Sequence, residues 1–282
     1  MSQDTLRDHL SRRLARTYAR TQMAAPPERS AHSQFEMTVS GVTDLNAHLR
    51  RLTFSAAEFA DLSLVSSDEY FGLIMPPARG PLVMPDGDRT NIRAAIADLA
   101  DPPTLRWYTI RAHRPVEQQI DVDVVTHAHP GPGLAWVMRA KVGDRAGFRT
   151  GGGLYRGGSV GQPQVLIGDE TAVPAILAIL DGPEVRSAGP LRVHLEVPDV
   201  TYLDGVEIPA EVTIHLRGDE LPGTALLDAL ATSADLDDLG YAWVCGESSL
   251  ATGLRRHLVR ERGLDKRQVL FSGYWKLGQA RG

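Results

Sequence analysis

The sequence predicts a two-domain protein, with an antiparallel β-barrel over residues 35–158 followed by an α/β domain with a parallel sheet over residues 159–282. Three observations favour this fold class. The chain has 282 residues, which is too long for one small core and fits two domains of ordinary size. Its first half alternates short strand-like stretches with turn residues, and its second half alternates strands with helices. Residues 1–34 are predicted to be a separate N-terminal helical segment.

The N-terminal segment carries leucines at helical spacing. Leu6, Leu10 and Leu14 recur among arginines and polar residues, which predicts an amphipathic helix over residues 1–22. Such a helix can lie on a membrane, but its narrow apolar stripe favours packing against the protein itself. The segment lacks the apolar run of a secretory signal, and no stretch approaches the roughly 20 apolar residues of a membrane span.

Composition argues against several classes of protein. The net charge is -5 at pH 7 and no basic arm stands out, which argues against nucleic-acid binding. The single cysteine, Cys245, excludes an internal disulfide framework and any cysteine-based zinc or iron–sulfur site. We therefore expect a soluble protein of the reducing cytoplasm. The sequence gives no indication of the oligomeric state.

The barrel is predicted from short stretches in which apolar and polar residues alternate or apolar residues run together, bounded by turn residues. These stretches are residues 35–39, 49–54, 70–75, 105–111, 120–125 and 142–148. Residues 77–104 are rich in Pro, Asp and Gly, and carry a predicted helix at 91–100. Such a long excursion between strands is often functional.

The second half of the chain alternates buried-type strands with helices, which predicts a parallel sheet covered on both faces. The predicted strands are residues 164–167, 191–197, 212–216, 241–245 and 270–278, and the predicted helices are residues 172–180, 226–230 and 250–262. Ligands of such sheets bind beyond the carboxyl ends of the strands.

The strand at 105–111 carries the residues on which the functional prediction depends. Arg106 can fork around a diphosphate, Tyr108 offers a flat ring with a hydroxyl, and Thr109 adds a second hydroxyl. A flavin dinucleotide needs these three features, because it combines a diphosphate, a planar ring system and a reactive ring nitrogen. The alternative is an ordinary half-buried strand with exposed arginines.

A glycine-rich turn follows the strand that ends at Val125. Residues 131–133 read Gly-Pro-Gly and lead into a predicted helix at 134–138, whose free amides and dipole suit a phosphate. His127 could donate a hydrogen bond to the same anion. His127 and His129 also form a pair that could hold a metal, but no third ligand is obvious nearby, and we predict no metal site.

Two loops at the carboxyl ends of the parallel strands carry acids. Asp169, Glu170 and Thr171 follow the first strand, and Gly246 and Glu247 follow the fourth. The helix start after the first strand can receive a diphosphate or a ribose, although the usual Gly-X-Gly-X-X-Gly fingerprint is absent. Helix capping is the alternative explanation for these acids. On physical grounds alone it is the better explanation at the loop after the first strand, and an equally good one for Glu247 after the fourth.

Taken together, these motifs resemble the siderophore-interacting protein family, a branch of the ferredoxin–NADP reductase superfamily. The resemblance runs from about residue 35 to the end of the chain. The motifs that carry it are Arg106-X-Tyr108-Thr109-X-Arg111, Asp121-X-Asp123 leading to His127, Gly-Pro before Trp136, Gly143-Asp144, Gly168-Asp169-Glu170-Thr171-Ala172-X-Pro174-Ala175, Gly246-Glu247 and Gly273-Tyr274-Trp275-Lys276-X-Gly278.

The resemblance implies a role for each matching residue. Arg106 would hold the diphosphate of FAD, with Arg111 and His127 flanking the phosphates. Tyr108 would stack on the flavin and Thr109 would bond near its N5, so these two are the predicted catalytic residues. The other residues predicted to contact FAD or the nicotinamide cofactor are Trp107, Val125, Gly133, Leu134, Ala135, Trp136, Asp169, Glu170, Thr171, Gly246 and Glu247.

The chain departs from the family pattern at two places. The family usually has a serine two residues before the tryptophan, where this chain has Leu134, so only backbone amides would meet the phosphates there. The family also tends to have Gly-Pro where this chain has Gly151-Gly152-Gly153.

The resemblance implies a ferric-siderophore reductase, in which NADH or NADPH reduces FAD and the flavin reduces siderophore-bound Fe(III) to Fe(II). Arg255 and Lys276 are predicted to meet the anionic substrate. One alternative is a general flavin or ferredoxin-type reductase. The other is a non-enzymatic siderophore-binding protein, and Leu134 in place of the family's serine is the feature that keeps this second alternative open. Asp199 and Asp204 favour NADH and Arg217 favours NADPH, so the choice of donor stays open.

Overall fold

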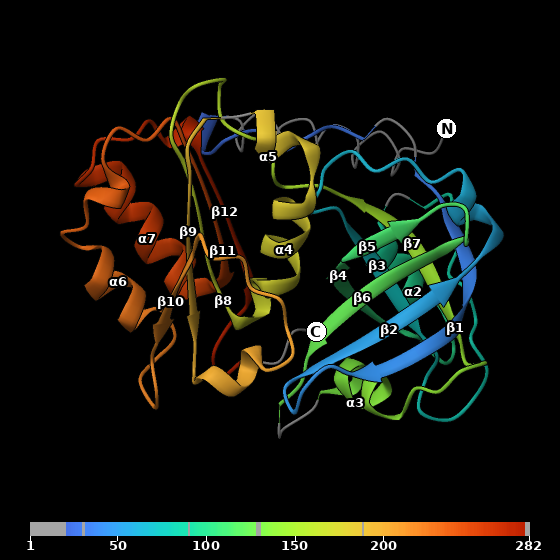
Figure 1. Ribbon diagram of the computed structural model, residues 1–282. Helices are drawn as coiled ribbons and strands as arrows, with labels where there is room; N and C mark the ends of the chain where they lie inside the picture. The colour runs from blue at the N-terminus through green and yellow to red at the C-terminus, as the bar shows by residue number, and fades with distance from the viewer. Residues whose placement is uncertain (1–20, 30–31, 90, 128–130, 188, 280–282) are drawn as a thin grey trace.

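Two sheets organise the protein (Figure 1). The computed structural model describes residues 21–29, 32–89, 91–127, 131–187 and 189–279. The first sheet is antiparallel and has the order β4-β3-β7-β1-β2-β6-β5. Its strands are β1 (Gln34–Asp44), β2 (Leu49–Ser55), β3 (Tyr70–Met75), β4 (Thr104–Thr109), β5 (Ala112–Arg114), β6 (Gln119–Val125) and β7 (Arg145–Gly152).

The alternation in these strands buries one core inside the curled sheet. Met37 and Val39 of β1 and Leu52 and Phe54 of β2 pack with Phe148 of β7 in this core. One face of each strand is therefore apolar for the reason that the sequence indicated. The helix α3 (Pro132–Arg139) packs against the same core, since its Leu134, Trp136 and Val137 belong to it.

The predicted strand 105–111 is shorter than expected, because the chain changes partner at its end. The strand β4 stops at Thr109. The amide of Ile110 still donates to the carbonyl of Glu69, directly before β3, at 2.8 Å, whereas that of Arg111 donates to the carbonyl of Asp121 on β6 at 2.8 Å. Two residues thus join β4 and β5, the strands at the two ends of the sheet order, and close the barrel.

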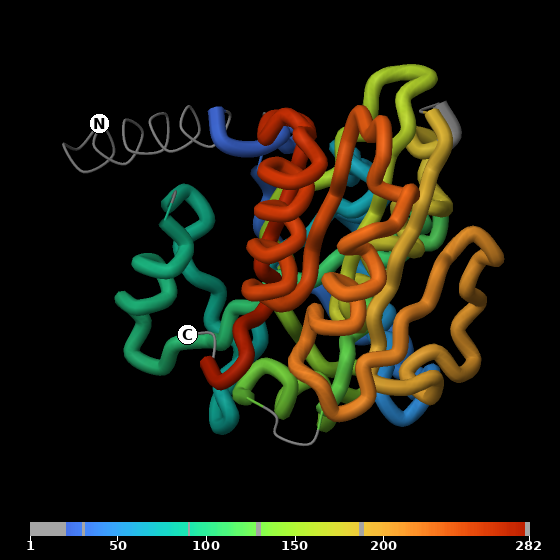
Figure 2. The backbone as a smooth tube through the Cα atoms, turned by 90° about the vertical axis from the view of Figure 1, so that its left-hand side faces the viewer, coloured from blue at the N-terminus to red at the C-terminus, as the bar shows by residue number. Residues whose placement is uncertain are grey.

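The excursion between β3 and β4 forms a lobe on the side of the barrel (teal in Figure 2) and contains α2 (Ile92–Ala97). Arg149 of β7 fixes this lobe, because its guanidinium donates to the carbonyls of Gly87 at 3.2 Å and Arg89 at 2.9 Å. Most of the helix predicted over residues 1–22 lies outside the described residues. Among the described residues, Ala24 is buried and its amide donates to the carbonyl of Val269 at 2.9 Å.

The second sheet is parallel and has the order β10-β9-β8-β11-β12. Its strands are β8 (Gln164–Asp169), β9 (Leu191–Val197), β10 (Val212–Leu216), β11 (Tyr241–Glu247) and β12 (Val269–Trp275). Within this domain the chain first forms the central strand β8 and then β9 and β10 on one side of it. It then crosses to the other side of β8 and forms β11 and β12. The point where the direction reverses, between the carboxyl ends of β8 and β11, is where such sheets bind ligands.

Helices cover both faces of this sheet (Figure 1). Leu166 of β8 faces α4, and its neighbours Val165 and Ile167 face the helices on the other side. The helices are α4 (Val173–Asp181), α5 (Pro183–Ser187), α6 (Thr224–Leu230) and α7 (Ser248–Arg260), with short 3-10 turns η1 (Ala57–Ala60), η2 (Glu170–Ala172), η3 (Val200–Leu203), η4 (Ala234–Leu236) and η5 (Lys266–Gln268). Pro174 lies in the first turn of α4, as expected. Within the described residues, no helix is both long and apolar enough to cross a membrane.

A buried carboxylate joins the two domains. Asp68 accepts hydrogen bonds from the amides of Leu154 and Tyr155 at 2.9 and 2.8 Å, and from the indole of Trp243 on β11 at 2.9 Å. The strand β6 of the barrel also packs against η2 and α4. The barrel and the carboxyl edge of the parallel sheet therefore adjoin.

The glycines at 151–153, which depart from the family pattern, have a packing explanation. A Cβ at Gly151 would lie 2.4 Å from the carbonyl oxygen of Tyr70, and one at Gly153 would lie 2.1 Å from the Cβ of Ser66. The segment that leaves the barrel therefore passes too close to residues 66–70 for a side chain at either position.

Candidate functional site

Arg106 lies against the start of α3. A Cβ on Gly133 would be 2.8 Å from the Cγ of Arg106 and 3.3 Å from the Cε of Met75, so the absence of a side chain at 133 lets the arginine approach the helix. Arg106 is partly exposed. The strand and the helix thus bring a guanidinium and a positive helix end together, which is a suitable arrangement for a phosphate group.

Tyr108 shares a face of the sheet with Arg106. In the register of β3 and β4, Tyr108 lies opposite Phe71 and Arg106 lies opposite Leu73. The phenol packs beside the barrel core and remains partly exposed. Burial raises the pKa of Tyr108 to about 12, and the charge of Arg106 offsets only part of this. The phenol is therefore neutral at physiological pH and keeps its proton for donation.

Trp107 and Thr109 lie on the opposite face of β4. The indole of Trp107 meets the ring of Tyr70 edge to face, with 5.6 Å between ring centroids, and Thr109 lies opposite Tyr70 at the end of the strand. This position separates Trp107 from Arg106 and Tyr108, but its indole is exposed, and the cofactor contact predicted for Trp107 stays a prediction. The role predicted for Thr109 near flavin N5 stays a prediction.

Gly131 is the N-cap residue of α3, and Pro132 lies in the first turn of the helix. The amides of Gly133 and Leu134 belong to the open end of the helix. The amide of Ala135 already donates to the carbonyl of Gly131 at 2.9 Å, so the phosphate contact predicted for it is not available. The side chains of Leu134 and Trp136 are buried in the barrel core, which limits any cofactor contact of these residues to the backbone.

His127 follows β6 and its side chain is exposed, beside half-buried Val125. His129 lies outside the described residues, so the His127–His129 pair is not described. No group of three or more His, Cys, Asp or Glu side chains that could hold a metal occurs in the part of the chain that the structure describes.

Arg111 pairs with an acid of the parallel domain. Its guanidinium pairs with Asp181 of α4 at 2.7 Å, across the boundary between the domains. The prediction that Arg111 flanks the phosphates stays a prediction, and it would require the guanidinium to leave or share the exposed Asp181. The change of partner after Thr109 turns Arg111 toward α4, and periodicity along a single strand could not reveal this.

Asp169 joins the ends of three strands at the carboxyl edge of the parallel sheet. Its carboxylate accepts from the amide and the hydroxyl of Thr171 at 2.9 and 2.5 Å. It also accepts from the amide of Glu247 at 2.6 Å and from the indole of Trp275 at 2.9 Å. Burial, reinforced by the charge of Glu170, raises the pKa of Asp169 while these donors oppose the shift.

A cofactor contact through the carboxylate of Asp169 is excluded in this structure, because the side chain is completely buried. Gly246 makes room for it, since it has a φ of +147° and a Cβ there would lie 2.7 Å from the Cγ of Asp169. Thr171 is partly exposed beside this carboxylate and stays a predicted cofactor contact.

Glu170 and Glu247 are also occupied within the protein. Glu170 holds the guanidinium of Arg217 through two hydrogen bonds, at 2.6 and 2.7 Å. Glu247 caps α7 by accepting from the amides of Ser249 and Leu250, and it accepts from the amide of Leu277 at 3.1 Å. The capping explanation is therefore confirmed at Asp169 and Glu247, and the predicted cofactor contacts of these side chains are wrong.

The two predicted substrate residues differ in their surroundings. Arg255 donates to the carbonyl of Gln22 at 2.8 Å and lies 4.8 Å from the ring centroid of Phe271, but it is partly exposed and its substrate role stays a prediction. Lys276 is exposed at the end of β12, next to Leu277, whose amide reaches Glu247. Its position is compatible with an anionic substrate, and its role stays a prediction.

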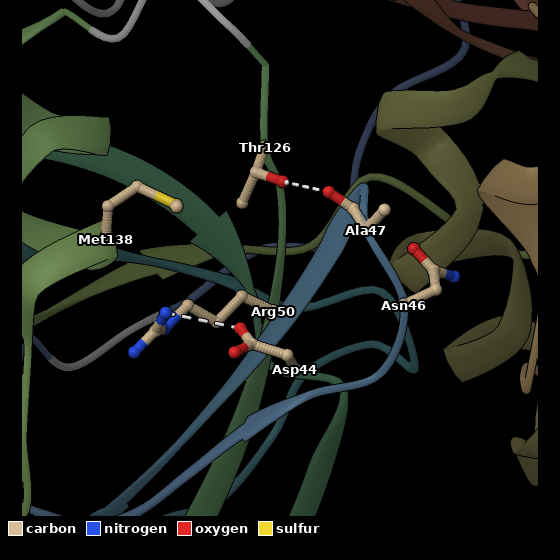
Figure 3. Close-up of a pocket in the computed structure, with 6 residues that line it drawn as sticks. All are labelled: Asp44, Asn46, Ala47, Arg50, Thr126 and Met138. Carbon is tan, nitrogen blue, oxygen red and sulfur yellow. Dashed lines mark hydrogen bonds and ion pairs between the residues drawn. The ribbon is translucent and has the colours of Figure 1, made fainter.

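A pocket of about 390 Å³ lies where the turn between β1 and β2 approaches α3 (Figure 3). Thr126, directly before His127, donates to the carbonyl of Ala47 at 3.3 Å, and Arg50 pairs with Asp44 at 3.2 Å. The sequence alone predicts no role for this turn. It was missed because its proximity to α3 depends on the closure of the barrel, which no local pattern reports.

The turn between β1 and β2 also contacts the parallel domain. The amide nitrogen of Asn46 donates to the carbonyls of Tyr202 at 3.1 Å and Asp204 at 2.9 Å. The rings of His48 and Tyr202 are stacked with centroids 3.9 Å apart. The barrel therefore contacts the loop that follows β9.

Comparisons with known proteins agree with this architecture. Residues 38–153 match the family model for the siderophore-interacting FAD-binding domain, and residues 162–278 match that for siderophore-interacting protein. An uncharacterised protein of Mycobacterium tuberculosis is 30% identical over 201 residues, which cover 66% of this chain and 70% of that protein. Ferric vibriobactin reductase ViuB of Vibrio cholerae is 28% identical over 182 residues, which cover 63% of this chain and 66% of that protein.

Solved structures show the same arrangement of the two domains. A siderophore utilization protein from T. fusca has a TM-score of 0.73 at 27% identity and covers 90% of this chain and 97% of its own. The siderophore-interacting protein SipS from Aeromonas hydrophila has a TM-score of 0.70 at 26% identity and covers 88% of this chain and 93% of its own. The predicted fold class is thus confirmed, and the chain belongs to the siderophore-interacting protein family.

Proposed function

We propose that the protein is an FAD-dependent ferric-siderophore reductase that takes electrons from a nicotinamide cofactor. The observation that carries this proposal is the contact between Arg106 and the start of α3, with Tyr108 on the same face of β4. The family models and the relatives named as ferric-siderophore reductases support it.

The residues of the barrel fit FAD. A diphosphate carries negative charge, and Arg106 and the amides of Gly133 and Leu134 would hold it without a side-chain hydroxyl at 134. The neutral phenol of Tyr108 would lie against the flavin ring and exclude water from one face. The bound flavin would accept a hydride from the nicotinamide and pass single electrons to iron.

The nicotinamide would enter at the carboxyl ends of β8 and β11, where the order of the parallel strands reverses. Thr171 is partly exposed there, and the carboxylate of Asp169 fixes its hydroxyl. Because β6 packs against η2, this edge adjoins the barrel strands. We infer that Thr171 orients the nicotinamide toward the flavin.

The substrate would be Fe(III) bound by the hard oxygen ligands of an anionic siderophore, which hold Fe(II) less tightly after reduction. The exposed ammonium of Lys276 would attract such a complex. We place the reaction in the cytoplasm, where a chain with the single buried thiol of Cys245 would meet a reducing environment.

Anaerobic mixing tests this proposal. The FAD-loaded protein is mixed with NADH or NADPH and a ferric siderophore, in the presence of a ferrous chelator that absorbs visible light. We expect flavin bleaching followed by formation of the ferrous complex. Bleaching without any trapped Fe(II) would contradict the substrate, and an acceptor screen would then identify a general flavin or ferredoxin-type reductase.

A further inference from the structure

The loops after β9 and β10 lie where parallel sheets of this kind recognise the adenosine ribose of a dinucleotide. An acid there bonds to the 2′-hydroxyl of NADH, whereas an arginine accommodates the 2′-phosphate of NADPH. Residues 198–223 contain a single Lys or Arg, Arg217. The same stretch contains six acids, which are all exposed: Asp199, Asp204, Glu207, Glu211, Asp219 and Glu220.

Arg217 is already held between two carboxylates. Both ends of its guanidinium bond to Glu170, at 2.6 and 2.7 Å, and its Nη1 lies 3.5 Å from Glu196. The side chains of Arg217 and Glu170 are 8% and 9% exposed, and that of Glu196 is completely buried. Both terminal nitrogens of the Arg217 guanidinium are therefore already paired with the two carboxylate oxygens of Glu170.

The surroundings keep this ion pair in place. Glu196 cannot turn away easily, because it accepts from the amides of Gly223 at 2.7 Å and Leu226 at 3.1 Å. Tyr202 lies beside the pair: burial, followed by the charge of Glu170, raises the pKa of its phenol. The barrel holds Tyr202 in turn, through the stacked ring of His48.

We infer that the electron donor is NADH rather than NADPH, and that Glu170 sets this preference by withholding Arg217 from a 2′-phosphate. A 2′-phosphate would bring two negative charges to loops whose acids are exposed and whose one arginine is engaged. A 2′-hydroxyl meets no such repulsion and can donate to a carboxylate such as Asp199. This inference deepens the proposed function and rests on it for the site at which the dinucleotide binds.

Calorimetric titration with NAD⁺ and NADP⁺ tests this without any turnover. We expect the full-length protein to bind NAD⁺ at least about tenfold more tightly, the effect of one charge-assisted contact. Glu170→Gln should strengthen NADP⁺ binding about tenfold and change NAD⁺ binding far less. Adding Arg217→Ala to this variant should remove the gain. Asp237→Asn, which removes the acid of a different arginine pair, should leave the ratio unchanged.

Equal or tighter binding of NADP⁺ by the unmodified protein would overturn the inference. A preference for NAD⁺ that persists unchanged in Glu170→Gln would overturn the role of Glu170. If neither dinucleotide binds and neither NADH nor NADPH bleaches the FAD-loaded protein, the nicotinamide donor of the proposed function fails, and this inference fails with it. Flavin bleaching by NADPH alone would reject the inference and leave the reductase proposal intact.

Discussion

Removing the carboxylate of Asp169 should destabilise the parallel domain and disorder its carboxyl edge. In Asp169→Ala the amide of Glu247 loses its acceptor, and Glu247 is only 2% exposed. An unsatisfied buried donor costs about 1–3 kcal/mol. Trp275 and Thr171 are partly exposed residues, so water can replace the carboxylate at their three donors, and each adds about 0.5–1.5 kcal/mol or less.

The loss of a buried charge offsets part of this cost, since burial disfavours the ionised form of Asp169. We therefore expect the free energy of unfolding to fall by about 3 kcal/mol. Urea unfolding followed by tryptophan fluorescence, to which Trp243 and Trp275 of this domain contribute together with Trp107 and Trp136 of the barrel, measures it. Thr171→Val removes one hydroxyl from the same carboxylate and should cost about 1 kcal/mol. A loss below about 0.5 kcal/mol in Asp169→Ala would refute the argument, because surface substitutions have that effect.

Two further predictions concern the barrel helix and the pH dependence of stability. Gly133→Ala should weaken FAD binding in a spectroscopic titration, because the new Cβ would lie 2.8 Å from the Cγ of Arg106. Gly131→Ala is the matched control and should bind FAD normally, because a Cβ at that position would have no other atom within 4 Å. Burial, followed by the charge of His215, lowers the pKa of His194 to about 4 from 6.5. Between these values only the unfolded chain binds this proton, so the contribution of His194 to the free energy of unfolding should fall as the pH drops from 6.5 to 4, against the opposite contribution of Asp169, whose pKa is raised to about 6. His194→Gln should flatten this slope in urea titrations, whereas the exposed-site change His127→Gln should retain it.

The fold could be predicted from the sequence because its periodicities are local. Alternation in β1 and β2 and the change to strand–helix rhythm after residue 163 were sufficient to distinguish the two sheets. The end of β4 could not be predicted in this way. Ile110 and Arg111 continue the alternation, but the amide of Arg111 bonds to Asp121 on β6 instead of to the β3 side, and this partner is set by the tertiary arrangement.

The site was predicted less completely, because residue type does not report burial. Asp169 and Glu247 suit a ribose and a helix cap equally well, and the fold decides for the cap by burying both side chains. Leu134 replaces a polar residue of the family pattern and belongs to the barrel core. Arg111 and Arg255 are engaged by Asp181 and by Phe271 with Gln22, contacts that only the tertiary arrangement creates.

The spectrum of the protein during titration with FAD tests the central claim most directly, with Arg106→Ala beside the unmodified chain. The account predicts that the unmodified protein binds FAD and perturbs its visible band, and that Arg106→Ala binds at least about tenfold more weakly, since a charge-assisted diphosphate contact is lost. Arg145→Ala, which removes an exposed arginine of β7, should bind FAD normally. Equal affinity in Arg106→Ala, or no FAD binding by the unmodified protein, would contradict the account.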